Sequence, residues 1–295
     1  MADKEFFGIF PYLVTPLDEQ GRLKEQVLAD LVDHLIRQGV HGITPLGSTG
    51  ETPYLDWATK KRTVEVVMSA TAGRVPVVAG ICSTSTQGAI QEATEIEKLG
   101  VDGILTMMPG YFPLADAQIV GHFRAVARSV SCPIVLYTNP KFQTWDFTVE
   151  ALKQLAEEPN IQYLKDASGN VGKLVSLVAT LGSRIRIFSD TSSVPLFMFL
   201  IGGVGWMSGP ACVIPKQSIE LYEMARQKRW DEAALLQIKQ WPLNAAFQRF
   251  TLSACVKAGL EMQGFPVGSP LPPQKQLNAE ERKTLEKILR DIGVL

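Results

Sequence analysis

Residues 132–167 read CPIVLYTNPKFQTWDFTVEALKQLAEEPNIQYLKDA, and this stretch holds one complete strand–helix–strand repeat. Its first apolar run predicts a buried strand, TVEALKQLAEEP has the spacing of an amphipathic helix, and IQYLKDA predicts the next strand. Two strands that are joined through a helix lie parallel in one sheet. The stretch therefore predicts an α/β protein.

The same alternation continues in both directions along the chain. Short apolar segments predict eight strands, which are GIFPYLVTP (8–16), GITPLGS (42–48), VPVVAGI (75–81), VDGILTMMP (101–109), CPIVLYTNP (132–140), IQYLKDA (161–167), IRIFSD (185–190) and VGWMSGP (204–210). Helical periodicity fills the segments between them. Either an open doubly wound sheet or a barrel could result. No GxGxxG follows the first strand, and eight near-regular units favour a (β/α)8 TIM barrel.

The strand pattern stops near residue 210. Four helical segments follow, which are PKQSIELYEMARQKRW (215–230), DEAALLQIKQWPLNAAFQRF (231–250), TLSACVKAGLEMQG (251–264) and NAEERKTLEKILRDIG (278–293). No linker of a kind that separates domains precedes them. We expect a barrel core over residues 1–210 and a C-terminal helical extension of the same domain over 211–295.

Composition excludes several classes of function. The chain has 295 residues, of which 46% are hydrophobic and 20% charged, and its net charge is −1. This balance gives no excess of positive charge for nucleic acid or anionic membranes. The apolar stretches are too short to span a bilayer, and the start MADKEFFGIF has no secretory pattern. The sequence predicts a globular, cytoplasmic protein.

Metal and disulfide chemistry are not expected. The cysteines and histidines are few and scattered, namely Cys82, Cys132, Cys212, Cys255, His34, His41 and His122. None of them forms a CxxC, HxH or HExxH pattern, so the sequence predicts no metal site.

Lys165 is the sharpest candidate for chemistry. In a TIM barrel the active site lies at the carboxyl ends of the strands, and Lys165 ends the predicted strand 161–167. The period-two rule places it on one face with Ile161 and Tyr163, pointing into the barrel mouth. Either it pairs with Asp190 on the next strand, or it is a Schiff-base nucleophile. A buried amine can have its pKa lowered enough to attack a ketone, which favours the nucleophile.

Two tyrosines lie on neighbouring segments. Tyr137 ends the apolar run PIVLY and is expected beside Lys165, where it could transfer protons. Alone, it would be an aromatic residue at the rim of the core. Tyr111 lies in the turn MMPGYF (107–112), where a tyrosine ordinarily packs or forms an interface.

PLGSTGET (45–52) predicts an anion-binding loop. Gly47 lets the main chain approach an anion closely, and Ser48 and Thr49 supply hydroxyls as well as backbone N–H groups. The alternative is a helix capping box from Ser48 to Glu51, but Asp56 is a better N-cap for the helix that follows. A phosphate would also fit the loop. A carboxylate is favoured because no basic residue lies near it in the sequence.

Together these residues resemble one family, the dihydrodipicolinate synthase and N-acetylneuraminate lyase family of class I aldolases. The resemblance rests on FPYLVTP (10–16), GSTGE (47–51), PVVAG (76–80), YTNP (137–140), YLKDASGN (163–170), GGVGWMSG (202–209) and the segment PVGSPLPP (266–273). It covers nearly the whole chain. GSTGE, a strand-five tyrosine and a strand-six lysine in this order are specific to it.

The resemblance implies the roles of several residues. Lys165 would form an imine with pyruvate or another 2-oxo acid, and Tyr137 would relay protons. Ser48 and Thr49 would bind the substrate carboxylate, and Thr49 would link Tyr137 to Tyr111. In the family this last tyrosine reaches into the neighbouring subunit of a tight dimer, and homotetramers built from two such dimers are common. No cofactor and no metal would be needed.

The sequence departs from the family at positions that concern the substrate. Dihydrodipicolinate synthases have an arginine where this chain has Phe142, and the neighbouring Lys141 cannot reproduce its bidentate fork. Asp190 stands where many members have glycine and could hold a substrate hydroxyl. Met207 and Trp206, with Phe142, are expected to make the outer pocket apolar.

The sequence thus predicts a Schiff-base lyase, an aldolase or dehydratase, that acts on a hydroxylated 2-oxo acid or sugar acid. Dihydrodipicolinate synthase, which condenses pyruvate with aspartate semialdehyde, is the second hypothesis. A non-catalytic barrel that senses a carboxylate ligand and a barrel that handles phosphosugars are the alternatives of other classes.

Overall fold

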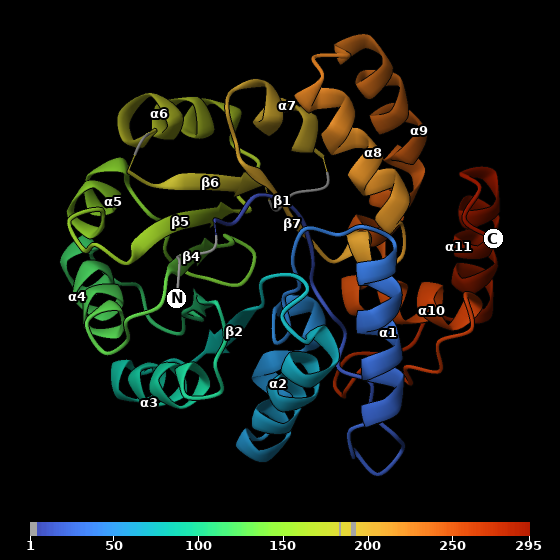
Figure 1. The fold of residues 1–295 in the computed structure, drawn as a ribbon, viewed down its shortest axis with the longest axis horizontal. Helices are drawn as coiled ribbons and strands as arrows, with labels where there is room; N and C mark the ends of the chain where they lie inside the picture. The colour runs from blue at the N-terminus through green and yellow to red at the C-terminus, as the bar shows by residue number, and fades with distance from the viewer. Residues whose placement is uncertain (1–4, 183, 190–192) are drawn as a thin grey trace.

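In the computed structural model, which describes residues 5–182, 184–189 and 193–295, seven parallel strands form one curled sheet. The strands are β1 (Gly8–Pro11), β2 (Val78–Cys82), β3 (Gly103–Met107), β4 (Ile134–Thr138), β5 (Ile161–Asp166), β6 (Arg186–Ser189) and β7 (Gly205–Ser208). Their order is β1-β7-β6-β5-β4-β3-β2, so the sheet turns back until its last strand pairs with its first. The predicted TIM barrel is confirmed (Figure 1).

The predicted strand at 42–48 pairs more briefly than the others. Within it, Ile43 forms an isolated parallel bridge to Val77 before β2, and Thr44 forms one to Tyr12 after β1. These two bridges close the barrel between β1 and β2. Pro45 follows directly and has no N–H to extend the ladder, which explains why the pairing is short.

Helices alternate with the strands where periodicity predicts them. They are α1 (Glu25–Arg37), α2 (Trp57–Thr71), α3 (Thr86–Glu97), α4 (Asp116–Ala127), α5 (Val149–Leu155), α6 (Val171–Leu181) and α7 (Pro195–Leu200), followed by α8 (Pro215–Arg226), α9 (Trp230–Arg249), α10 (Leu252–Met262) and α11 (Ala279–Asp291). Helices α2 to α7 surround the sheet (Figure 1). Across the described ranges, no helix has both the length and the apolar character that a membrane crossing requires.

The C-terminal helices cover one side of the barrel and reach the face formed by the carboxyl ends of its strands. Helix α8 packs against β1 and α7, so the layer of helices around the sheet continues past residue 210. Helix α10 packs against the 3₁₀ turn Ser48–Gly50. The division into a core and an extension at residue 210 stays a prediction.

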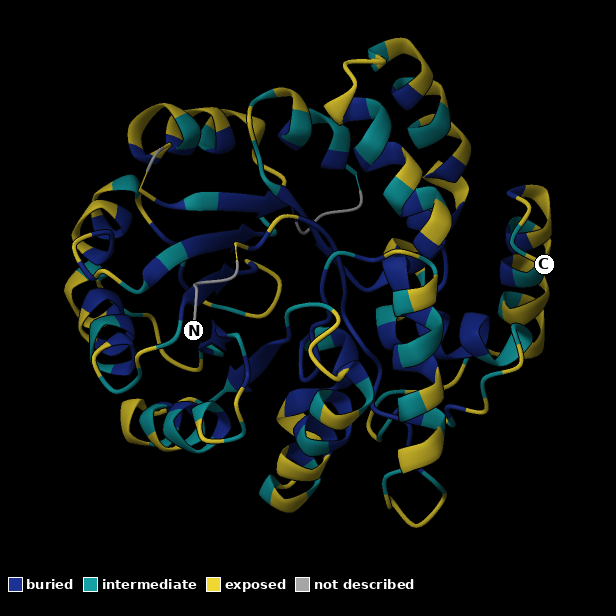
Figure 2. Cartoon of the chain, viewed as in Figure 1, coloured by how far each residue is buried: buried dark blue, intermediate teal, exposed yellow. Residues whose placement is uncertain are grey.

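Most strand residues are buried, whereas most of the helices carry exposed residues as well as buried ones (Figure 2). One cluster of large side chains fills the barrel interior, and a larger cluster lies between the strands and the helices. Strand β5 contributes to both. Tyr163 lies in the interior cluster, whereas Ile161 and Leu164 lie in the outer one.

This arrangement corrects one prediction about β5. Ile161 does not share a face with Tyr163, because the pairing of β4 with β5 shifts register between Ile134 and Val135. A residue inserted on one strand reverses the alternation of side chains before it. The part of β5 that precedes the shift therefore faces the helices.

Candidate active site

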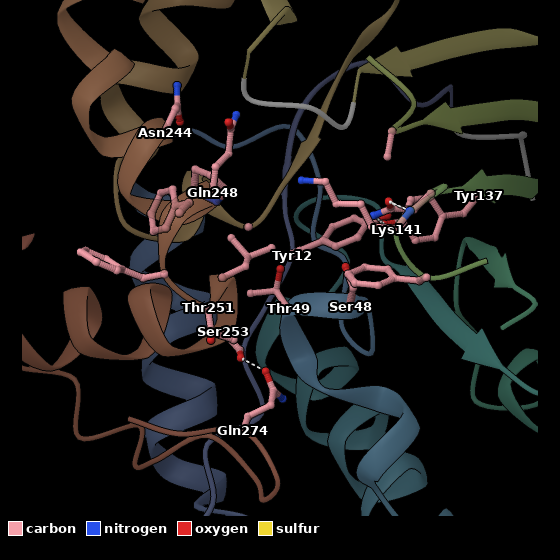
Figure 3. Close-up of a pocket in the computed structure, with 18 residues that line it drawn as sticks. Tyr12, Ser48, Thr49, Tyr137, Lys141, Asn244, Gln248, Thr251, Ser253 and Gln274 are labelled. Carbon is pink, nitrogen blue, oxygen red and sulfur yellow. Dashed lines mark hydrogen bonds between the residues drawn. The ribbon is translucent and has the colours of Figure 1, made fainter. Parts of the chain in front are cut away.

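A cavity of about 420 Å³ opens at the carboxyl ends of the strands (Figure 3). The strands and the loops after them contribute Tyr12, Ser48, Thr49, Tyr137, Asn139, Lys141, Phe142, Ala167, Gly209 and Pro210. The C-terminal helices and the loop before α11 contribute Asn244, Phe247, Gln248, Phe250, Thr251, Leu252, Ser253 and Gln274. The cavity is therefore formed between the barrel and its extension.

Lys165 lies below the floor of this cavity, inside the barrel. Its side chain is fully buried, and Nζ lies 3.9 Å from the centre of the Tyr12 ring and 3.8 Å from that of Tyr137. The parallel register places Tyr137 directly beside Lys165. Both tyrosines line the cavity. The lysine amine thus contacts two aromatic rings that line the cavity.

Sequence reasoning missed Tyr12 and Asn139. Tyr12 follows Phe10 by two residues, so the period-two pattern that was applied to Lys165 would have placed its ring inside the barrel. Asn139 donates a hydrogen bond from Nδ2 to the Tyr137 hydroxyl at 3.0 Å. This bond holds the phenol at the edge of the cavity.

The 47–51 loop forms a tight turn beside the cavity. A Cβ on Gly47 would lie 2.4 Å from the Tyr12 ring, so only glycine fits there. Ser48 and Thr49 both line the cavity, and the Thr49 hydroxyl lies against Gly209. The loop has no capping box. Instead, Asp56 caps α2 through the N–H of Thr59 at 2.7 Å.

Glu51 has a different role from the one that a capping box would give it. Its side chain is 1% exposed and forms an ion pair of 2.5 Å with Lys257 of α10, which is equally buried. Burial lowers the pKa of Lys257, and the charge of Glu51 acts in the opposite direction. The pair ties the 47–51 loop to the C-terminal helices.

A second cavity of about 340 Å³ adjoins the first, with which it shares Ser48, Tyr137, Asn139, Phe142 and Gln274. Its wall also includes Met107, the last residue of β3, and Met108 and Pro109 of the loop that follows. Tyr111, two residues further on, is 83% exposed and contacts Phe112. Within the described part of this single chain, Tyr111 lines neither cavity and is not brought to Tyr137.

The residues expected in the outer pocket have different positions. Phe142 is 55% exposed and lines both cavities. Met207 is fully buried in the interior cluster and, among the described side chains, is not part of either cavity wall. The prediction for Trp206 was wrong, because its ring packs with Ile9 and Tyr222 outside the barrel. Asp190 lies outside the described residues.

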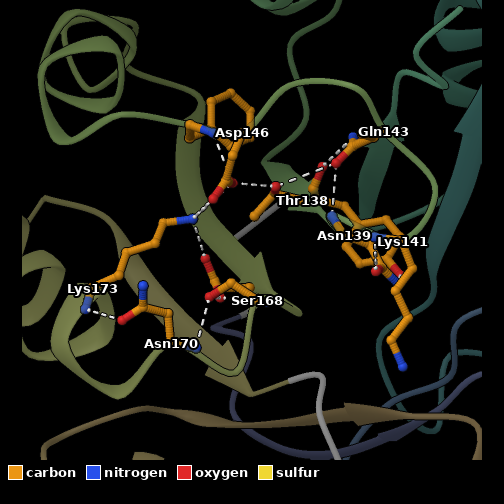
Figure 4. A network of polar contacts seen from close by, with 11 residues as sticks. Thr138, Asn139, Lys141, Gln143, Asp146, Ser168, Asn170 and Lys173 are labelled. Atoms are coloured by element: carbon orange, nitrogen blue, oxygen red, sulfur yellow. Dashed lines mark hydrogen bonds and ion pairs between the residues drawn. The ribbon is translucent and has the colours of Figure 1, made fainter. Parts of the chain in front are cut away.

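A polar network links the ends of β4 and β5 to α6 (Figure 4). Asp166 faces away from Lys165 and forms an ion pair of 2.8 Å with Lys173 of α6. Lys173 also lies 2.8 Å from Asp146, which accepts a hydrogen bond from the Thr138 hydroxyl. The network anchors the residues that follow Tyr137 and Lys165.

Among the described residues, no cluster of three histidine, cysteine, aspartate or glutamate side chains could hold a metal.

The sequence and the structure of this chain are both similar to those of known proteins. Residues 5–292 match the model of the dihydrodipicolinate synthetase family. A 4-hydroxy-tetrahydrodipicolinate synthase from Methanopyrus kandleri is 32% identical over 290 residues, which cover 98% of this chain and 97% of the relative.

Solved structures agree with this match. Dihydrodipicolinate synthase from Cyanidioschyzon merolae, solved with lysine bound, has a TM-score of 0.95 at 30% identity and covers 99% of this chain and 100% of its own. The enzyme from Acinetobacter baumannii, complexed with pyruvate, has a TM-score of 0.93 at 27% identity, with 98% and 99% covered. The chain therefore belongs to the dihydrodipicolinate synthetase family, and it is a lyase that acts through a lysine imine.

Proposed function

We propose that Lys165 is the lysine that forms the imine, and that its partner is pyruvate or another small 2-oxo acid. The observation that carries this proposal is the position of Nζ, fully buried between Tyr12 and Tyr137 at the base of the cavity. Removal of an amine from water favours its neutral form, which is the nucleophilic one. The amine adds to the keto carbon, and water leaves as the carbon–nitrogen double bond forms.

The 47–51 loop would hold the substrate carboxylate. Ser48 and Thr49 line the cavity beside Tyr137, and their backbone and hydroxyl groups can donate hydrogen bonds to an anion. A carboxylate held there would direct the neighbouring keto carbon toward Lys165. The protonated imine nitrogen then accepts electron density when the adjacent bond breaks or forms.

Tyr137 would transfer the protons of these steps. Tyr137 lines the cavity, its hydroxyl accepts a hydrogen bond from Asn139, and its ring contacts the lysine amine. A positioned phenol can give a proton to the carbinolamine oxygen and take one back later.

The second reactant would be a hydroxylated aldehyde, so that the product is a hydroxylated 2-oxo acid; dehydration of such an acid is the alternative outcome. A substrate with a second carboxylate would need a cationic partner in the cavity. Among the described lining residues only Lys141 is charged, and its neighbour is Phe142. Condensation with aspartate semialdehyde remains the second candidate, because the relatives named above carry that enzyme's name.

Borohydride trapping tests the imine. The protein is incubated with pyruvate and sodium borohydride, digested, and searched for a reduced adduct by mass spectrometry. We expect the adduct on Lys165, and none in Lys165→Ala, whose circular dichroism should match the unchanged chain. An adduct on another lysine, or turnover by Lys165→Ala, would refute the assignment.

We further propose that the protein works as a homo-oligomer in which Tyr111 completes the site of a partner subunit. Tyr111 and Phe112 expose an aromatic pair next to the second cavity, and a pair of exposed rings is typical of an interface. Sedimentation equilibrium would measure the assembly, and a monomer at all concentrations would exclude it.

A further inference from the structure

Ser253 and Gln274 lie side by side on the wall of the first cavity. Ser253 belongs to the first turn of α10, and Gln274 to the proline-rich loop before α11. The Ser253 hydroxyl and Gln274 Oε1 form a hydrogen bond of 2.5 Å (Figure 3). What these two groups offer a substrate depends on the direction of that bond.

The buried carboxylate of Glu51 determines how the Gln274 amide is oriented. Gln274 Nε2 donates to Glu51 Oε1 at 2.8 Å, and the same oxygen accepts the backbone N–H of Leu271 at 2.7 Å. The other oxygen of Glu51 pairs with Lys257, whose Nζ also donates to the carbonyl of Ser269 at 2.8 Å. A carboxylate only accepts hydrogen bonds, so the NH₂ end of the amide has to face it.

The direction of the serine bond follows from this orientation. With its nitrogen turned to Glu51, Gln274 presents its oxygen to Ser253, and an amide oxygen can only accept. Ser253 therefore uses its proton on Gln274. Toward a ligand the serine offers only the lone pairs of its oxygen, whereas the Gln274 NH₂ group has a second N–H to donate.

We propose that Ser253 and Gln274 select a substrate hydroxyl, and that Glu51 and Lys257 are the positioning residues that fix their polarity. This inference rests on the proposed function, because it names the substrate that meets the Lys165 imine. A hydroxyl can donate to Ser253 and accept from Gln274, whereas a carboxylate cannot donate to Ser253. The substrate class is a neutral hydroxylated aldehyde or, in the direction of cleavage, the hydroxylated 2-oxo acid that forms when this aldehyde condenses with pyruvate.

The remaining polar side chains of this wall agree with that class. Asn244, Gln248 and Thr251 are neutral and also line the cavity. They come from α9 and from its junction with α10, the helix that holds Ser253. Neutral amides and hydroxyls can pair with several substrate hydroxyls, and none of them compensates a second carboxylate.

The test compares three aldehydes as partners of pyruvate: glyceraldehyde, propanal, which has the same carbon chain without hydroxyls, and aspartate semialdehyde. We expect the unchanged enzyme to have its highest kcat/KM with glyceraldehyde. Ser253→Ala should lower the preference for glyceraldehyde over propanal by about tenfold, the size of one hydrogen bond, with the KM for pyruvate unchanged. Gln274→Met, which removes both the acceptor of Ser253 and the second donor, should lower it in the same direction.

Ser176→Ala is the matched control, because Ser176 is exposed on α6 and its hydroxyl donates to the Gly172 carbonyl of the same helix. An equal loss for both aldehydes in Ser253→Ala, or a native preference for aspartate semialdehyde, would overturn the inference. So would a chain that traps pyruvate at Lys165 yet condenses it with neither glyceraldehyde nor propanal. Absence of the trapped adduct from the unchanged chain would instead refute the proposed function.

Discussion

Tyr137 joins three features of the site at the scale of a single residue. Its ring contacts the Lys165 amine, its hydroxyl accepts a hydrogen bond from Asn139, and the residue lines both cavities. A side chain in this position can reach both the lysine nitrogen and a substrate oxygen. Its hydroxyl should therefore matter for rate more than for binding.

We expect Tyr137→Phe to lower kcat by roughly 10²- to 10⁴-fold, the range usual for a group that transfers protons. The phenyl ring keeps the aromatic contact with Lys165, so pyruvate should still bind. Steady-state kinetics with borohydride trapping would separate the two effects. A rate within about twofold of the unchanged enzyme would show that another group moves the proton.

The sequence predicted the Lys165–Tyr137 neighbourhood because two simple rules decide it. Alternation along a strand points a side chain inward, and consecutive strands lie side by side. The same rules could not find Ser253 or Gln274. Their approach to the cavity depends on how α10 and the loop before α11 fold back over the barrel, and no local periodicity encodes that contact.

At the scale of elements, the Glu51–Lys257 ion pair joins the 47–51 loop, α10 and the proline-rich loop. Both charges are fully buried, and each has hydrogen bonds to other groups. Removal of one partner leaves the other charge buried without compensation. The ion pair therefore makes these three segments depend on one another.

We expect Lys257→Met to lower the free energy of unfolding by about 3–5 kcal/mol, because Glu51 would then be buried without its cation. The double variant Glu51→Gln with Lys257→Met should recover most of this loss, since no charge remains buried. Urea denaturation of Lys257→Met, Glu51→Gln and the double variant measures the three losses of stability. Losses that simply add in the double variant would contradict a coupled pair.

Hydrophobic periodicity does not predict how the strands pair in detail. Periodicity found the alternation of strands and helices, but it could not detect the register shift that turns Ile161 toward the helices. Nor could it show that the segment at 42–48 pairs only through Ile43 and Thr44. Both depend on hydrogen bonds to neighbouring strands, which the amphipathic pattern of one segment does not specify.

At the scale of the whole molecule, mixing two inactive variants tests whether Tyr111 of one subunit completes the active site of its partner. Tyr111→Phe should lose the partner-supplied hydroxyl, and Lys165→Ala should lose the imine. If Tyr111 serves the neighbouring subunit, a hybrid dimer contains one site with both residues intact. Equal mixing of the two variants under conditions that exchange subunits should restore roughly a quarter of native activity. A mixture that stays inactive while native mass spectrometry detects the hybrid would place Tyr111 outside the partner's site.

The stability of the whole fold should depend on pH through its histidines. His122 is buried on α4, where its Nδ1 lies 3.0 Å from the hydroxyl of Thr86, and burial lowers its pKa to about 4. Burial also lowers the pKa values of His34 and His41. In the unfolded chain a histidine has a pKa of about 6.5.

The direction of the effect follows from where protons bind. Between about pH 6.5 and pH 4 the unfolded chain takes up a proton at His122 that the folded chain does not, so stability falls as the pH falls. We expect the free energy of unfolding, measured in urea, to decrease from about pH 7.5 to pH 5 with a slope of up to about 1.4 kcal/mol per pH unit for each such histidine. His122→Gln should reduce that decrease, whatever constant loss of stability the substitution causes. An unchanged decrease in His122→Gln would show that other groups control the acid sensitivity of the barrel.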